Sequence, residues 1–128
     1  MVTSSLAPML TVKDASAAVD FYVRALGATE GSRLQTPTGQ VVAQMFVDGL
    51  EFYVVDENPD AFNLSPETLG GTSIRLSLIV ADPDETIAQA LAAGATEVFP
   101  VDDQSYGLRQ GRVADPFGHH WLIGTPLS

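Results

Sequence analysis

The chain has 128 residues, the length of one domain, and contains no cysteine, which excludes disulfide frameworks, thiolate metal sites and cysteine nucleophiles. Its 16 acidic residues against 6 basic ones give a formal charge of -10, which disfavours nucleic acid and anionic membranes as partners. We expect a soluble, cytoplasmic protein, because no segment approaches the ~20 apolar residues of a membrane span and the N-terminus resembles no targeting signal.

The first half of the chain predicts one helix among four strands. Apolar residues recur at helical spacing over residues 15–26, where Asp14 supplies an N-cap and Gly27 a C-terminal stop. Asp48-Gly49 is a typical hairpin turn between two strands. The expected strands cover residues 7–12, 29–36, 40–47 and 50–55. The order of elements is therefore βαβββ.

The second half predicts the same order. Asp82, Pro83 and Glu85 supply an N-cap, a first-turn proline and a capping-box glutamate for a helix that ends before Gly94. The expected strands cover residues 73–80, 97–101, 109–114 and 119–124. Between the halves, residues 56–72 lack clear periodicity and are expected to form a connector and a candidate lid. One domain over residues 1–128 thus contains module 1 at about 6–55 and module 2 at 73–125.

A short repeat indicates that the two modules are copies of one unit. The tetrapeptide Gly-Ala-Thr-Glu occurs at residues 27–30 and again at 94–97. Each copy closes a segment that opens with Val-x-Asp, at Val12 and at Val80. We infer that the chain contains a duplicated βαβββ unit.

Motifs within the two units point to a family. Phe-Tyr at residues 21–22 precedes Leu-Gly-Ala at 26–28, and Asp-Pro-Phe-Gly-His-His-Trp occurs at 115–121. With the paired units, they resemble the vicinal oxygen chelate superfamily, which includes glyoxalases, bleomycin-resistance proteins and extradiol dioxygenases, over nearly the whole chain. The resemblance implies an α+β fold in which two βαβββ modules form a curled mixed-sheet half-barrel cup with helices on the outer face. It also implies a small organic ligand and a homodimer.

The resemblance also locates four positions that hold metal ligands in other members. These positions fall early on the first strand and midway along the last strand of each unit, at Ala7, Tyr53, Arg75 and Leu122. None of these side chains supplies the imidazole or carboxylate donors that a divalent ion needs, so we expect no metal and no other cofactor. A register shift of two residues would substitute Glu51 or His120, which keeps a displaced divalent metal site as an alternative.

Three of these residues are candidates for ligand binding. Arg75 is expected to point into the cup, where it would pair with a ligand carboxylate or phosphate. An internal salt bridge between Arg75 and Glu51 is equally compatible with the sequence, and Glu51 is kept as a cup-facing candidate. Tyr53 and Leu122 would give the cup an aromatic and apolar floor, unless they simply pack in the core.

His119 and His120 are the only histidines, and adjacent residues on a strand point to opposite faces. His120 is expected to face the cup beside Leu122. It is a weak candidate for a general acid or base, because no partner for it can be identified, and a hydrogen-bonded structural role is the alternative. His119 is expected to be structural, as is Trp121, which would pack under the helices.

The segment Tyr106-Gly107-Leu108-Arg109 resembles the loop at the rim of the cup, where Tyr106 and Arg109 would touch the ligand. In the alternative, Arg109 pairs locally with Asp102 or Asp103 across a tight turn. No glycine pattern in the chain matches a nucleotide-binding loop.

These expectations support three hypotheses. The first is a metal-independent small-molecule-binding protein of the glyoxalase and bleomycin-resistance type, which sequesters a drug, such as an antibiotic, or a metabolite. The second is a glyoxalase-like, metal-dependent lyase or isomerase whose displaced metal site includes Glu51 and His120. The third is an interaction module whose cup is filled by its own side chains.

Overall fold

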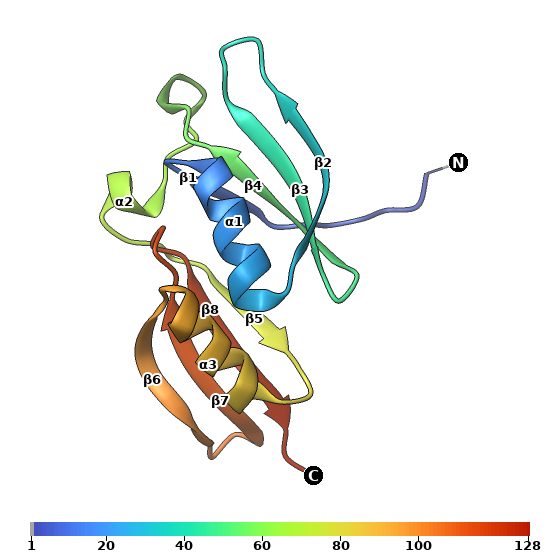
Figure 1. Cartoon of the computed structure of the whole chain (residues 1–128), viewed down its shortest axis with the longest axis vertical. Coiled ribbons are helices and arrows are strands. Elements are labelled where there is room, and N and C mark those ends of the chain that lie inside the picture. Colours follow the sequence, from blue (N-terminus) through green and yellow to red (C-terminus); the bar gives the residue numbers. More distant parts are fainter. Residues whose placement is uncertain (1) are drawn as a thin grey trace.

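The computed structural model describes residues 2–128 as two modules, each a four-stranded mixed sheet with one long helix (Figure 1). In module 1, helix α1 (Ala15–Leu26) accompanies a sheet of strand order β1-β4-β3-β2. The first strand is parallel to its neighbour, and the other pairs are antiparallel. The strands are β1 (Met9–Val12), β2 (Thr29–Gln35), β3 (Val41–Val47) and β4 (Leu50–Asp56).

Module 2 repeats this topology with strand order β5-β8-β7-β6 and helix α3 (Pro83–Ala93). Its first strand is again parallel to its last. The strands are β5 (Arg75–Ile79), β6 (Thr96–Asp103), β7 (Leu108–Ala114) and β8 (His120–Pro126). The α+β class and the duplicated βαβββ unit predicted from the sequence are confirmed. Among residues 2–128, no helix combines the length and apolar character needed to cross a bilayer.

The two long helices begin and end where the sequence predicts. The side chain of Asp14 accepts a hydrogen bond from the Ala17 amide at the start of α1, and Asp82 does the same for Glu85 in α3. Gly27 ends α1 in the left-handed conformation, with φ of 67°, which glycine adopts without a steric penalty.

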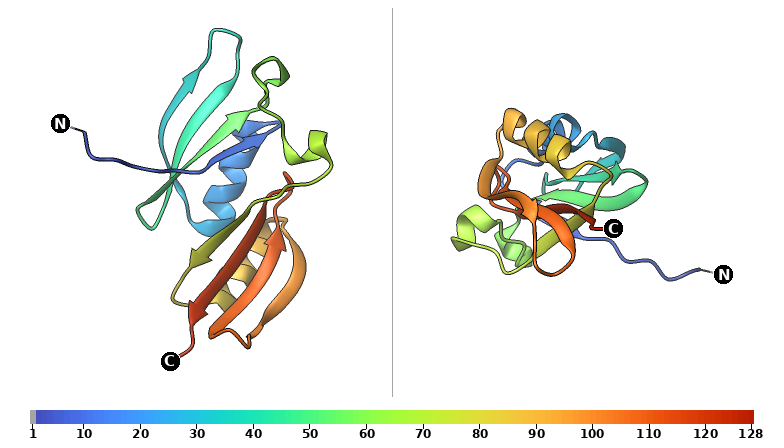
Figure 2. Two further views of the ribbon diagram at one scale, coloured as in Figure 1. Left: turned by 180° about the vertical axis from the view of Figure 1, so that it is seen from behind. Right: turned by 90° about the horizontal axis from the view of Figure 1, so that it is seen from below.

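Both long helices lie on the same side of the two sheets (Figure 2). Apolar side chains fill the space between helices and sheets. In this core Tyr22 of α1 lies 5.6 Å, between ring centroids, from both Phe52 of module 1 and Trp121 of module 2. The predicted packing of Trp121 under the helices is confirmed, and the cluster belongs to both modules.

A buried carboxylate adds a polar link between the modules. Asp115 Oδ2 accepts hydrogen bonds from the Tyr22 hydroxyl and from Trp121 Nε1, and Oδ1 accepts from the amides of Phe117 and His119. Burial, and next the charge of Asp115, raise the pKa of Tyr22 well above its ordinary value. The phenol therefore stays protonated and donates this bond.

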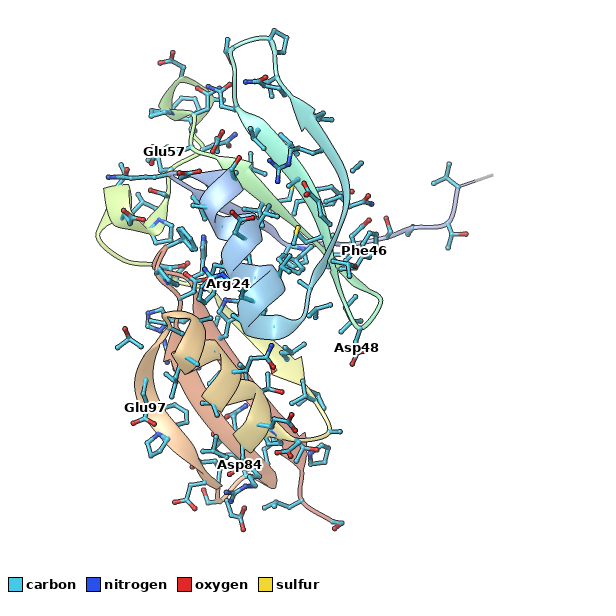
Figure 3. The ribbon with its side chains drawn as sticks, in the orientation of Figure 1. Arg24, Phe46, Asp48, Glu57, Asp84 and Glu97 are labelled. Carbon is cyan, nitrogen blue, oxygen red and sulfur yellow. The ribbon has the colours of Figure 1, made fainter. Side chains whose placement is uncertain are left out.

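The two helices are also joined directly. Gln89 Nε2 of α3 donates to the Arg24 carbonyl at 2.8 Å, and the Arg24 guanidinium reaches the Ala93 carbonyl at 3.4 Å. Figure 3 labels Arg24 in the lower half of α1, next to module 2. These contacts hold the modules side by side without closing one sheet onto the other.

The connector is more ordered than its sequence pattern suggested. It contains a short 3₁₀ helix, η1 (Pro59–Ala61), and one turn of α-helix, α2 (Pro66–Leu69). Glu57 accepts hydrogen bonds from the amide and hydroxyl of Ser65, which is fully buried. Pro66 packs so closely on Gly118 that a Cβ at that glycine would lie 2.7 Å from the proline Cβ. The connector is thus anchored on the turn that precedes β8.

Candidate functional site

Strand register defines a surface that we call the open face of module 2. The buried Leu78, Val113 and Trp121 point toward α3, so the alternating residues point to the opposite side. Three cross-strand rows make up this open face: Arg75, His120, Ala114 and Thr96, then Ser77, Leu122, Arg112 and Phe99, and then Ile79, Gly124, Gln110 and Asp102. The predicted candidates Arg75, His120 and Leu122 are therefore brought together on one surface.

His120 is held in one tautomer by a neighbour on this face. Arg112 Nε donates a hydrogen bond to His120 Nδ1 at 3.0 Å. Because a guanidinium has no acceptor atom, Nδ1 must be the unprotonated nitrogen, and the neutral ring carries its proton on Nε2. Burial, and next the charge of Arg112, lower the pKa of His120. The imidazole is therefore a neutral hydrogen-bond donor at neutral pH.

Arg75 does not form the internal salt bridge that the sequence left as an alternative. The ion pairs among residues 2–128 join Arg33 to Glu30, and Arg109 to Asp84 and Asp103. Arg75 and Arg112 take part in none of them. Two guanidinium groups on one open face thus lack a carboxylate partner within the described chain.

The open face of module 1 carries the other two cup candidates. Register places Met9, Tyr53 and Gln44 in one row, with Glu51 and Phe46 in the next. Glu51 Oε2 accepts a hydrogen bond from Gln44 Nε2 at 2.6 Å and a longer one, 3.5 Å, from the Tyr53 hydroxyl. Glu51 and Tyr53 therefore lie together, while the polar groups of module 2 lie on a separate sheet.

Two cavities lie between the modules. One, of about 300 Å³, is lined by Asp48, Asp82 and Glu85 among others. The other, of about 290 Å³, is mostly apolar, and its wall includes Glu51 and Ser77. Arg75, Tyr53, His120 and Leu122 line neither of these two cavities, whereas the candidate Glu51 lines the second.

The residues present do not fit the divalent ion that the fold implies in other proteins. The four expected positions hold Ala7, Tyr53, Arg75 and Leu122, which offer no imidazole or carboxylate. Residues 2–128 contain no group of three or more histidines and acidic residues that could hold a metal ion. The displaced alternative needs Glu51 and His120, which lie on different sheets.

The Arg109 side chain forms two ion pairs. Its side chain lies on the helix side of β7, where Nη2 and Nε bind the two oxygens of Asp84 at 2.7 and 2.8 Å. Figure 3 labels Asp84 on α3. Nη1 also reaches Asp103 at 3.0 Å, as the local-pairing alternative predicted. Hydrogen bonding to Arg109 lowers the pKa of Asp84. Because two carboxylates occupy its guanidinium, Arg109 is left out of the site proposed below, and its ligand contact stays a prediction.

Tyr106 stays an exposed residue at the turn before β7. Its hydroxyl donates to Gln110 Oε1 at 2.6 Å. Gln110 of β7 is itself buried and pairs with Gly124 of β8, so the phenol is held against the edge of the open face.

The two histidines have the opposite environments that strand alternation predicts. His119 is buried, and its Nε2 lies 2.8 Å from the Thr11 carbonyl of module 1, which makes it a structural donor. His120 lies on the open face.

Sequence reasoning missed Arg112, although counting alternate residues along β7 from the buried Val113 would have placed it on the open face.

Comparison with known proteins agrees with this fold. A family model described as a glyoxalase-like domain matches residues 8–123. The uncharacterized protein Rv0887c of Mycobacterium tuberculosis is 42% identical over 130 residues, which cover 98% of this chain and 76% of the relative. The uncharacterized protein Mb0911c of Mycobacterium bovis has the same identity, with 86% of its length covered.

Solved structures give the same result. TioX from Micromonospora sp. ML1 superposes with a TM-score of 0.75 at 30% identity, over 98% of this chain and 100% of that chain. The fosfomycin resistance protein FosX from Listeria monocytogenes reaches the same TM-score at 15% identity, over 98% and 95% of the two chains, and shows the likeness of fold alone. The chain therefore belongs to the glyoxalase-like domain family of the vicinal oxygen chelate superfamily.

Proposed function

We propose that this protein binds a small organic molecule without a metal ion and sequesters it rather than transforming it. The observation that supports this proposal is the open face of module 2, where the exposed Arg75 and the partly buried Arg112 and His120 lie beside the apolar Leu122. Such a mixture of a few polar groups on an apolar base is typical of sites for organic ligands.

The proposed site is completed by a second copy of the chain. Tyr53 and Glu51 lie on the open face of module 1, which belongs to a different sheet from Arg75 and His120. In a homodimer, the open face of module 1 in one copy would cover the open face of module 2 in the other. This arrangement encloses the ligand between both sets of side chains.

Sequestration is favoured over catalysis by the chemistry of His120. A general base needs a free nitrogen within reach of the substrate, and a partner that stabilises its protonated form. Here Nδ1 is occupied by Arg112 Nε, a cationic donor that disfavours protonation. We assign no catalytic residue for this reason.

Native mass spectrometry of the untagged protein tests the proposal. We expect a metal-free dimer that carries an organic adduct from the expression host. About one divalent ion per chain would instead support the lyase or isomerase alternative, and turnover lost in Glu51→Gln would then confirm it. A particle with neither adduct nor metal would favour the interaction module.

Variants test the site assignment once an adduct is identified. Arg75→Ala and Tyr53→Ala are expected to weaken its binding, because they remove contacts from the two opposed faces. Arg33→Ala is the control, since Arg33 contacts Glu30 and Ser16 on the helix side of module 1. Unchanged affinity in both site variants would show that the ligand binds elsewhere.

A further inference from the structure

We propose that the open face of module 2 selects ligands that carry an oxyanion, a carboxylate or a phosphonate, on an apolar or aromatic body. This inference rests on the proposed binding function and specifies the chemistry of its ligand. It is carried by the arrangement of Arg75, Arg112 and His120 around Leu122 and Phe99.

The first argument is the distribution of charge. The chain has 16 acidic and 6 basic residues, so most cations have acidic side chains available as partners. Arg75 and Arg112 nevertheless lie on one face without an ion pair in the described chain. Glu51 was the salt-bridge partner expected for Arg75, but its carboxylate accepts a hydrogen bond from Gln44 instead. Two arginines that share a face without an ion pair form a local positive region on a strongly acidic protein.

The second argument is the direction of the available hydrogen bonds. Arginine only donates, and the bond from Arg112 Nε to Nδ1 leaves His120 with a donor at Nε2. The polar groups of Arg75, Arg112 and His120 that remain available on this face are therefore all donors. An oxyanion has only acceptor atoms and accepts several such bonds at once, whereas a cation or an ammonium group would find no acceptor among them.

The third argument is the apolar surface next to these donors. Leu122 lies directly across from Arg112 on β8, and Phe99 lies across from it on β6. All three side chains are partly buried rather than fully solvated. A ligand whose charged group meets the arginines would thus lay an apolar or aromatic body along this row.

A second use of the arginines competes with this one. If Glu51 of the other copy paired with Arg75 or Arg112 in the proposed homodimer, that arginine would serve the contact between copies and not an anion. The experiment must therefore separate a ligand contact from a contact between two copies.

Benzoate, benzamide and phenylphosphonate are suitable probes, because benzamide has nearly the shape of benzoate without its charge. Each is titrated into ¹⁵N-labelled protein at low ionic strength and followed by amide NMR. We expect benzoate or phenylphosphonate to bind with shifts on β5, β7 and β8, and benzamide to bind at least about tenfold more weakly, because hydrogen bonds to charged groups contribute that much. The tighter of the two anions identifies the preferred oxyanion.

Arg75→Gln and Arg112→Gln are each expected to weaken anion binding about tenfold or more, with little change for benzamide. Arg33→Gln is the matched control, because it makes the same change on the helix side of module 1. Arg75 is exposed, so its variant keeps the fold even if Arg112→Gln does not. Imidazole ¹⁵N spectra provide a separate readout. We expect them to show the Nε2-protonated tautomer of His120 in the unaltered protein and no single fixed tautomer in Arg112→Gln.

Three results would overturn the inference. Equal affinity for benzoate and benzamide would remove the charge preference while the proposed binding function stands. If none of the three probes bound, the charge preference would also be wrong. The native mass spectrum would still test sequestration by itself. Dissociation of a dimer in Arg75→Gln, with unchanged benzoate affinity, would assign the arginines to the contact between copies.

Discussion

Modules 1 and 2 share one order of elements but differ in what their side chains do. Six residues of α1 are buried, against three of α3. On the open faces, module 1 presents Glu51 held by Gln44, whereas module 2 presents two arginines without ion pairs. The same βαβββ fold thus carries an acidic residue on the open face of one module and basic residues on the open face of the other. The fold requires the buried pattern and leaves the open faces to be set by function.

The strongest test of this comparison removes the polar link between the modules. Asp115→Ala should lower the free energy of unfolding by about 3 kcal/mol or more, because it leaves the Trp121 indole and the His119 amide buried without an acceptor. Urea denaturation measures the loss. Tyr22→Phe removes only one of the bonds and should cost about 1 kcal/mol. Similar losses for both variants would contradict the central role of Asp115.

A second test concerns the close packing of β7 against β8 in module 2. A Cβ at Gly124 would lie 2.7 Å from the Arg109 carbonyl oxygen, so Gly124→Ala should cost about 1–3 kcal/mol through overpacking. Gly71→Ala is the control, since nothing lies within 4 Å of a Cβ there and its φ is ordinary for any residue. Thermal unfolding compares the two, and an equal change would show that β7 and β8 move apart easily.

A third test uses the pH response of His120. Arg112, Arg75, His119 and Asp115 are the charged or titratable groups around it, and burial and Arg112 together keep its pKa below the unfolded value of about 6.5. The unfolded chain therefore takes up this proton first as pH falls. His120 thus contributes stability above pH ~6.5 that is lost as pH falls through the folded pKa.

NMR titration of the imidazole measures this pKa directly. Arg112→Gln should raise it, because the charge that lowers it most after burial is removed, and bound benzoate should raise it as well. A value at or above the ordinary one in the unliganded protein would show that Arg112 does not hold the ring.

The smallest effect is expected on the helix side of module 2. Asp84→Asn breaks the exposed ion pair with Arg109, and solvent screens such pairs. We expect a small loss of thermal stability that disappears at high salt, and no change in benzoate affinity. Weaker benzoate binding in this variant would return Arg109 to the candidate site.

Local patterns in the sequence predicted the fold almost completely. Caps such as Asp14 and Asp82 and the hairpin at Asp48-Gly49 act over a few residues, so the sequence alone locates them. Strand alternation also placed His119 and His120 on their correct sides. The ends of strands were predicted less well, because they depend on pairing with a neighbouring strand. For example, β5 begins at Arg75, two residues later than expected.

The candidate site was predicted less well, because its contacts join distant segments. The pairing of Arg109 with Asp84 depends on how α3 lies across β7, and the capture of Glu51 by Gln44 depends on the register of β3 and β4. The bond between Arg112 and His120 likewise needs two strands in their final alignment. The proposed roles of Arg75, Tyr53, Leu122 and Tyr106 stay predictions.

The hydrogen bonds of Asp115 to the Phe117 and His119 amides fix how many residues separate the turn from β8. One inserted or deleted residue in this turn would exchange the sides of His119 and His120 and of every later residue in the strand. Evolution can therefore alter the chemistry of this surface through point substitutions, while changes of length in the turn would expose the core. The fixed length of the turn keeps each residue of β8 on its own side of the sheet, so residues on one side can change without disturbing the other.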